Sequence, residues 1–183
     1  MAVLEESSAV GRDEQAVDFD VVVVGAGFAG LYATHVLREH GFSMRVYEQG
    51  DGIGGTWFWN RYPGARVDIQ SCEYMFTKFP ELEQEWDWTE LMPAQGEIER
   101  YLNFVADRLD LRRHIQLETR VESMVFDETT STWTTQLSTG DTVRSRFVIA
   151  ATGCLSAPLE PDIAGLRSEE RRVGKEGRSR WSP

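Results

Sequence analysis

The stretch that decides the fold is Asp20-Val21-Val22-Val23-Val24-Gly25-Ala26-Gly27-Phe28-Ala29-Gly30. The four consecutive valines predict a strand buried on both faces, which is typical of the central strand of a parallel sheet. The run ends in a Gly-x-Gly-x-x-Gly motif, and a helical pattern of apolar residues starts at once at Phe28 and stops at His40-Gly41. A strand, a tight glycine turn and a helix N-terminus in this order predict a cradle for a diphosphate group.

Each glycine of the motif has an expected role. Gly25 permits the turn, Gly27 lets the backbone approach a pyrophosphate, and Gly30 lets the helix pack closely on the strand. A second predicted strand, Met44 to Tyr47, delivers Glu48 to the position from which an acidic side chain accepts hydrogen bonds from ribose hydroxyls. A carboxylate there repels the 2′-phosphate of NADP, so this site is expected to take FAD or NAD. A glycine turn without any ligand is the alternative.

The length and composition are those of an ordinary globular domain. The chain has 183 residues, of which 41% are hydrophobic and 27% are charged, so one domain with a sizeable core is expected. No window approaches 18 apolar residues, and the N-terminus lacks the basic and apolar regions of a signal peptide, so we expect a cytoplasmic protein without a membrane partner. The net charge of −11 disfavours nucleic acid. Cys72 and Cys154 have no metal-ligand spacing, so no metal is expected.

A second glycine-rich stretch follows Glu48. It reads Gly50-Asp51-Gly52-Ile53-Gly54-Gly55-Thr56-Trp57-Phe58-Trp59-Asn60-Arg61-Tyr62-Pro63-Gly64-Ala65-Arg66-Val67-Asp68. Its first glycines predict a loop whose backbone comes close to another group, and Pro63-Gly64 predicts a second turn. Exposed tryptophans beside glycines are a costly way to build a surface loop, which favours a binding role. Aromatic residues packed in a core, with the charges in solvent, are the alternative.

The rest of the chain predicts the remainder of an α/β domain. Residues 71–89 have no period and predict a loop with short helical turns, whereas the apolar spacing from Ile98 to Leu109 predicts an amphipathic helix. Residues 115–121 predict another parallel strand. Three β segments, at 121–126, 132–137 and 142–146, predict a small antiparallel meander. Residues 147–153 predict a further buried parallel strand, which ends in small residues that let the backbone approach a cofactor.

Together, the GAGFAG motif, Glu48 and the block GGTWFWNRYPGARVD resemble the N-terminal FAD-binding region of Baeyer–Villiger monooxygenases, in particular phenylacetone- and cyclohexanone-type enzymes. The resemblance runs from about Asp18 to Leu166. It implies a Rossmann-like FAD-binding domain of the two-dinucleotide-binding flavoprotein type, with a parallel sheet and a small antiparallel β-meander. It also implies an enzyme that uses FAD, NADPH and O₂ to insert oxygen beside the carbonyl of a small-molecule ketone, giving an ester or lactone.

The resemblance further implies which residues hold the cofactors. Residues 25–30 would hold the FAD diphosphate, and Glu48 would take the adenosine ribose. Arg66 and Val67 would touch the nicotinamide cofactor, and Asp68 would orient a catalytic arginine by charge-assisted hydrogen bonds. The full set of expected cofactor-binding residues is Gly25, Ala26, Gly27, Phe28, Ala29, Gly30, Glu48, Gly55, Thr56, Trp57, Arg66, Val67, Asp68, Tyr74 and Val121, with Asp68 also the expected catalytic residue.

Three segments are expected in the chain. Residues 1–17 form an acidic leader that is expected to be disordered, and residues 18–166 form the FAD-binding domain. Residues 167–183 resemble a translated sequencing adaptor and are expected to be a non-native tail. The arginine of the family and its NADPH domain have no counterpart here, so the chain is expected to be truncated and inactive on its own.

Three other functions remain open at this point. The first is a non-catalytic module that binds FAD or NAD, and the second is a flavin monooxygenase that oxidises nitrogen or sulfur. The third is a simple NAD dehydrogenase domain, which the meander and the Gly-Gly-Thr-Trp loop disfavour.

Overall fold

In the computed structural model, which describes residues 16–156 and residue 162, the domain is organised by one mixed sheet with the strand order β3-β2-β1-β6-β5-β4. The pairs β3–β2, β2–β1 and β1–β6 are parallel, and β5 pairs antiparallel with both β6 and β4. The strands are β1 (Phe19–Val24), β2 (Met44–Tyr47), β3 (Ile115–Gln116), β4 (Val121–Asp127), β5 (Thr132–Leu137) and β6 (Thr142–Ala150). The predicted α/β class, a parallel sheet with an antiparallel meander, is confirmed. Almost all of the expected leader and the whole of the expected tail lie outside the described residues.

The predicted strand, glycine turn and helix form as expected. Helix α1 (Phe28–Glu39) starts directly after the glycine motif and ends at His40, whose N–H donates to the carbonyl of Val36 at 3.1 Å. Gly41 follows with φ +77°, the left-handed conformation common after a helix end. The parallel register pairs Val24 with Tyr47. It therefore places the glycine turn after β1 beside Glu48 after β2.

Two strand predictions were wrong in their boundaries. Residues 142–146 and 147–153 were expected to form separate strands, but β6 is continuous: its first half pairs with β5 and its second half with β1. Phe147 is 57% exposed, so this strand is not buried on both faces. The strand expected over 115–121 is also shorter, because β3 ends at Gln116 and Glu118 takes φ +51°, a conformation incompatible with a strand.

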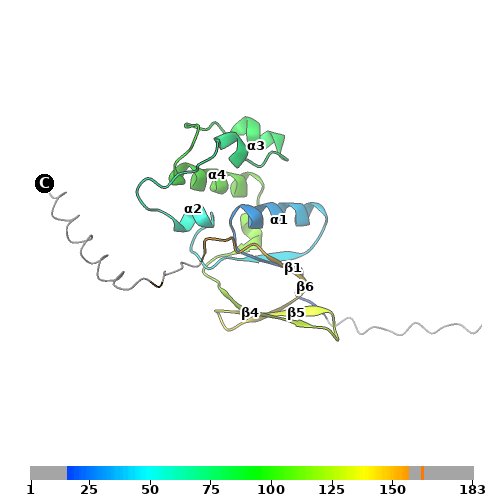
Figure 1. The fold of residues 1–183 in the computed structure, drawn as a ribbon. Helices are drawn as coiled ribbons and strands as arrows, with labels where there is room; N and C mark the ends of the chain where they lie inside the picture. Colours follow the sequence, from blue (N-terminus) through cyan, green and yellow to red (C-terminus); the bar gives the residue numbers. More distant parts are fainter. Residues whose placement is uncertain (1–15, 157–161, 163–183) are drawn as a thin grey trace, which may run out of the picture.

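The helices cover one face of the sheet and the β4–β5 hairpin lies on the other side (Figure 1). Besides α1 they are α2 (Thr56–Trp59), α3 (Pro80–Glu85) and α4 (Gln95–Arg108), with 3₁₀ turns η1 (Ser71–Tyr74) and η2 (Arg112–His114). Helix α2 lies within a stretch expected to be a loop, whereas α3 and η1 are the short turns expected in 71–89. No helix among the described residues has the length and apolarity needed to cross a bilayer.

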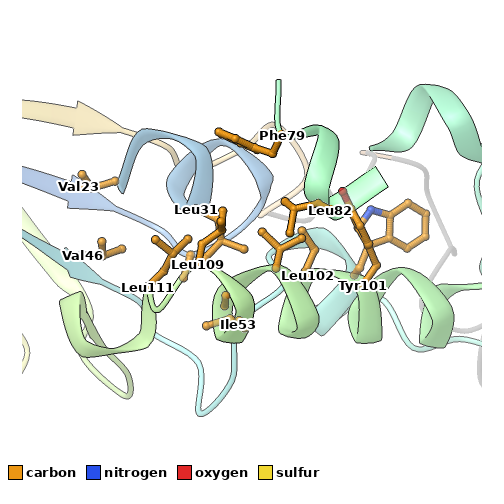
Figure 2. Close-up of a cluster of buried hydrophobic side chains, with 14 of the residues drawn as sticks. Val23, Leu31, Val46, Ile53, Phe79, Leu82, Tyr101, Leu102, Leu109 and Leu111 are labelled. Carbon is orange, nitrogen blue, oxygen red and sulfur yellow. The ribbon is translucent and has the colours of Figure 1, made fainter. Parts of the chain in front are cut away.

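The core lies between the sheet and the helices. Figure 2 shows Val23 and Val46 of the strands on one side of it, with Leu31 of α1 and Leu102 of α4 packed further in. The apolar stripe predicted for α4 faces this core: Ile98, Tyr101, Leu102 and Val105 are at most 1% exposed. A smaller cluster of Val22, Tyr47, Leu137 and Val143 lies on the opposite face, under the meander.

Leu82→Ala tests the attachment of α3 to the core. Leu82 is fully buried, so its truncation leaves a cavity and is expected to lower the free energy of unfolding by about 2–5 kcal/mol, measured by urea denaturation. Leu91→Ala is the matched control, because Leu91 is 62% exposed and its truncation should change stability by less than about 0.5 kcal/mol. Equal losses in the two variants would contradict the packing of α3.

Candidate cofactor-binding site

A cavity of about 590 Å³ lies at the carboxyl ends of β1, β2 and β6. Open α/β sheets bind their ligands at this edge, and the volume is that of a ligand pocket. Most of the lining comes from four segments far apart in sequence: the first glycine turn with α1, the end of β2, the second glycine loop with α2, and the chain after β6. Tyr74 and residues 119–121 complete it. Ten of the expected cofactor-binding residues line the cavity, namely Gly25, Gly27, Phe28, Ala29, Glu48, Gly55, Thr56, Trp57, Tyr74 and Val121.

The glycine motif supports the cavity as well as lining it. Gly25 takes φ +102°, and a Cβ there would lie 2.7 Å from the carbonyl oxygen of Ala151. A Cβ on Gly30 would lie 1.9 Å from the carbonyl oxygen of Gly25, so only glycine lets α1 approach the turn. Ala26 is fully buried. Neither Ala26 nor Gly30 lines the cavity, and both act on its shape through packing.

The two glycine loops touch each other, which the sequence did not predict. A Cβ on Gly55, which has φ +54°, would lie 2.9 Å from the Cα of Gly27. The N–H of Gly54 donates to the carbonyl of Ala26 at 3.0 Å. Gly27 therefore lets the second loop approach, in addition to its expected role of admitting a ligand.

The start of α1 has the donors that a phosphate group needs. Gly27 is the N-cap residue, so no side chain caps the helix, and the first turn holds no acidic residue. The first N–H groups of a helix have no partner within the helix and carry its positive dipole end. Because Gly27, Phe28 and Ala29 line the cavity, these donors fit an anionic diphosphate.

Glu48 has a structural role beyond the expected one. Its side chain is 5% exposed, and its two carboxylate oxygens accept the N–H groups of Ala26 at 2.8 Å and Gly50 at 2.9 Å. The residue thereby joins the first glycine turn to the start of the second loop. Each carboxylate oxygen has a further lone pair, so Glu48 can still accept a hydroxyl from the cavity.

Aromatic rings form one wall of the cavity. The Trp57 ring meets Tyr74 edge-on at 5.7 Å, and Tyr74 meets Phe28 edge-on at 5.2 Å. Trp57 is only 9% exposed, so it belongs both to the core and to the wall. Tyr47 also lines the cavity, where burial raises the pKa of its hydroxyl and keeps it neutral.

Arg66, Val67 and Asp68 are placed away from the cavity lining. The segment is extended, with an isolated bridge between Arg66 and Ala94. Alternate side chains of an extended segment point in opposite directions, so Val67 enters the core at 4% exposure while Arg66 and Asp68 lie in solvent. The guanidinium of Arg66 pairs with Glu90 at 2.8 Å. Arg66, Val67 and Asp68 therefore do not line this cavity, and their expected contacts with the nicotinamide cofactor and a catalytic arginine stay predictions.

Several lining residues were not predicted. Ala151, Thr152 and Gly153 belong to the stretch 147–153, whose small residues at the end were expected to approach a cofactor, but they were not among the named cofactor-binding residues. Gln49, Thr119, Arg120, Trp59 and Asn60 were missed. For Thr119 and Arg120, the only sequence signal of a place in the cavity lining was their position directly before Val121. Their approach to the cavity depends on the turn between β3 and β4, which no local pattern predicts. Asn60 belongs to the block GGTWFWNRYPGARVD, but the sequence assigned it no role.

Glu48→Gln tests the link between the two loops. An amide has one acceptor oxygen, so one buried N–H would meet an NH₂ group; we expect a loss of about 1–3 kcal/mol in the free energy of unfolding by urea denaturation. Glu122→Gln, at an exposed position of β4, is the control and should leave stability unchanged. A Glu48→Gln variant as stable as the control would show that the two hydrogen bonds contribute nothing.

Comparison with known proteins agrees with this geometry. The family model described as an NAD(P)-binding Rossmann-like domain matches residues 23–87. The chain is 46% identical, over 86% of its length, to acetone monooxygenase (methyl acetate-forming) of Gordonia sp. (strain TY-5) and covers 31% of that protein. It is 42% identical to phenazine N-monooxygenase PhzNO1 of Lysobacter antibioticus, with 84% of this chain and 28% of the relative covered.

A Baeyer-Villiger monooxygenase of Pseudooceanicola batsensis is 41% identical over 85% of the chain and is covered to 29%. Among solved structures, OTEMO in complex with FAD and NADP superimposes with a TM-score of 0.78 at 39% identity, covering 84% of this chain and 29% of that one. The chain thus spans less than a third of the length of the curated relatives it matches.

Proposed function

We propose, from the premise that this chain shares its FAD-binding-type domain with Baeyer–Villiger monooxygenases, that it is the FAD-binding part of an NADPH- and O₂-dependent enzyme of that type. The resemblance of the sequence to Baeyer–Villiger monooxygenases is confirmed by the similar proteins and solved structures described above. The observation that carries the proposal is the convergence of the GAGFAG turn, Glu48 and the Gly-Gly-Thr-Trp loop on one cavity. The proposed reaction inserts oxygen beside a ketone carbonyl and gives an ester or lactone.

The residues present fit FAD. The uncapped start of α1 suits the diphosphate, and Glu48 suits the adenosine ribose. Trp57 and Tyr74 offer an apolar wall to the flat isoalloxazine ring. When bound, FAD supplies the redox and oxygen-transfer chemistry. The residues of this chain would bind FAD, orient it and exclude water from the part of the cavity that α2 covers.

Arg66 and Asp68 enter the proposal differently from the cavity residues. Both side chains are exposed, so we propose that they act toward NADPH and a catalytic arginine only where the remaining part of a full-length protein covers this surface. Val67 anchors the segment in the core and takes no direct part. The described domain alone is therefore expected to bind FAD without oxidising ketones.

The proposed setting is a cytoplasmic enzyme with a small-molecule ketone and O₂ as substrates. Its net charge of −11 supports the absence of a nucleic-acid partner. A second candidate, oxidation at nitrogen, is favoured by the similarity to phenazine N-monooxygenase PhzNO1. The two reactions use the same kind of FAD-binding domain, so assays of the full-length protein with a ketone and with an N-heterocycle separate them.

A flavin-binding experiment tests the proposal. The purified chain mixed with FAD is expected to retain flavin absorbance at a ratio of about one per chain after gel filtration, and to leave NADPH unoxidised in the presence of ketones. A colourless protein that binds NAD instead would contradict the assignment.

Gly55→Ala sharpens this test. Its Cβ would strike the Gly27 backbone at 2.9 Å, and we expect FAD affinity to fall about tenfold or more by fluorescence titration. Gly140→Ala is the matched control: Gly140 also has a positive φ, of +90°, but nothing lies within 4 Å of its Cβ position and it is remote from the cavity. It should keep wild-type FAD affinity.

A further inference from the structure

The carbonyl end of α2 is held by side chains. A helix leaves its last carbonyl groups without partners inside the helix, and α2 has only four residues. Three of its carbonyl oxygens accept side-chain hydrogen bonds from outside the helix. The pairs are Asn60 Nδ2 to Thr56 at 2.9 Å, Gln95 Nε2 to Trp57, and Arg61 Nε to Phe58 at 2.7 Å.

A single carboxylate connects two of these three donors. Glu99 Oε2 accepts the Nε2 of Gln95 at 2.8 Å, and Glu99 Oε1 accepts the Nη2 of Arg61 at 2.8 Å. Arg61 also lies over the ring of Phe58, at 4.6 Å from its centroid. Glu99 is therefore bound to both side chains that hold the middle of α2.

The helix that carries Glu99, α4, is packed into the core. Glu99 lies on it between Ile98 and Tyr101, whose side chains are fully buried, so its Cα is fixed by the core. Its own side chain is 24% exposed, less than half the 54% of Arg61. Glu99 is thus the more buried partner of the pair, and it lies on the helix that is packed into the core.

An ordinary surface ion pair would not have this arrangement. Exposed pairs contribute little to stability and fix nothing beyond themselves. Here both side chains bound by Glu99 also donate to a backbone carbonyl of α2. Arg61 donates to Phe58 through Nε. The amide nitrogen of Gln95 donates both to Glu99 and to the carbonyl of Trp57. Loss of Glu99 would free two long side chains and leave the α2 carbonyls to solvent.

We infer that Glu99 is a positioning residue, which through Gln95 and Arg61 holds α2, and with it Thr56 and Trp57, against the cavity. The inference assigns a role to Asn60 and Arg61 of the second block, which close the helix that carries the cavity wall. It rests on the proposed function only in naming FAD as the ligand whose binding depends on this helix.

Hydrogen exchange of the chain without added ligand tests the positioning itself. The N–H groups of Trp59 and Asn60 donate to Gly55 and Thr56 at 3.1 and 3.0 Å. In Glu99→Leu they should exchange about tenfold faster or more than in the wild type, because α2 opens more often. Glu99→Gln keeps the packing and one acceptor oxygen, and should give an intermediate rate.

Glu85→Leu is the matched control. Glu85 holds Arg108 with two hydrogen bonds, at 2.7 and 2.9 Å, but lies on α3 outside the cavity lining. This variant should leave exchange in α2 unchanged. Exchange in α2 that is the same for Glu99→Leu, Glu99→Gln and the control would overturn the inference. If Glu99→Leu does not fold, Glu99→Gln alone decides between the two results.

FAD titration of the same variants separates this inference from the proposed function. Glu99→Leu is expected to raise the dissociation constant about tenfold, with Glu85→Leu unchanged. Faster exchange in α2 together with no FAD binding by the wild type would support the positioning role and refute the proposed function. Unchanged exchange with normal FAD binding would do the reverse.

Discussion

The cavity depends on one buried carboxylate. Glu48 accepts the N–H of Ala26 in the first glycine turn and that of Gly50 at the start of the second loop. Hydrogen bonds to a charged acceptor are stronger than neutral ones, and a buried donor left without a partner carries the full cost of its desolvation. Without this carboxylate, the two glycine-rich loops would keep their direct hydrogen bond from Gly54 to Ala26 but would lose the side chain that ties both of them to the end of β2. Gly27 and Gly55, which lie in these two loops, also approach each other closely.

The sheet provides the frame for these loops. Its central strand, β1, pairs with β2 on one side and with the second half of β6 on the other. The register brings the ends of all three strands to one edge, where Gly25, Glu48 and Ala151 follow them. Since β6 also pairs with β5, one continuous strand connects the meander to the segment that faces the cavity. The fold thus places distant segments of the chain around one volume.

The sequence predicted those features that local chemistry controls. The valines of β1, the glycine motif and the ends of α1 each carry a short-range signal, and all three form as expected. The continuity of β6 depends on a change of pairing partner from β5 to β1, which no local pattern records. The solvent-facing directions of Arg66 and Asp68 follow from the burial of Val67, and hence from tertiary packing. The resemblance identified the residues of the second block, but not the hydrogen bonds of Asn60 and Arg61 that close α2.

The titratable groups that line the described cavity bear on its proposed role. Both oxygens of Glu48 are engaged by backbone N–H groups, and burial keeps the hydroxyl of Tyr47 neutral because it raises its pKa. Arg120 and Tyr74 complete this set of four. A group that transfers protons in a reaction needs a pKa near the working pH, and the phenol of Tyr47, whose pKa is raised by burial, does not meet this condition. This lining supports the proposal that the described cavity holds a cofactor, and the proposed roles of Arg66 and Asp68 belong to the exposed surface on either side of Val67.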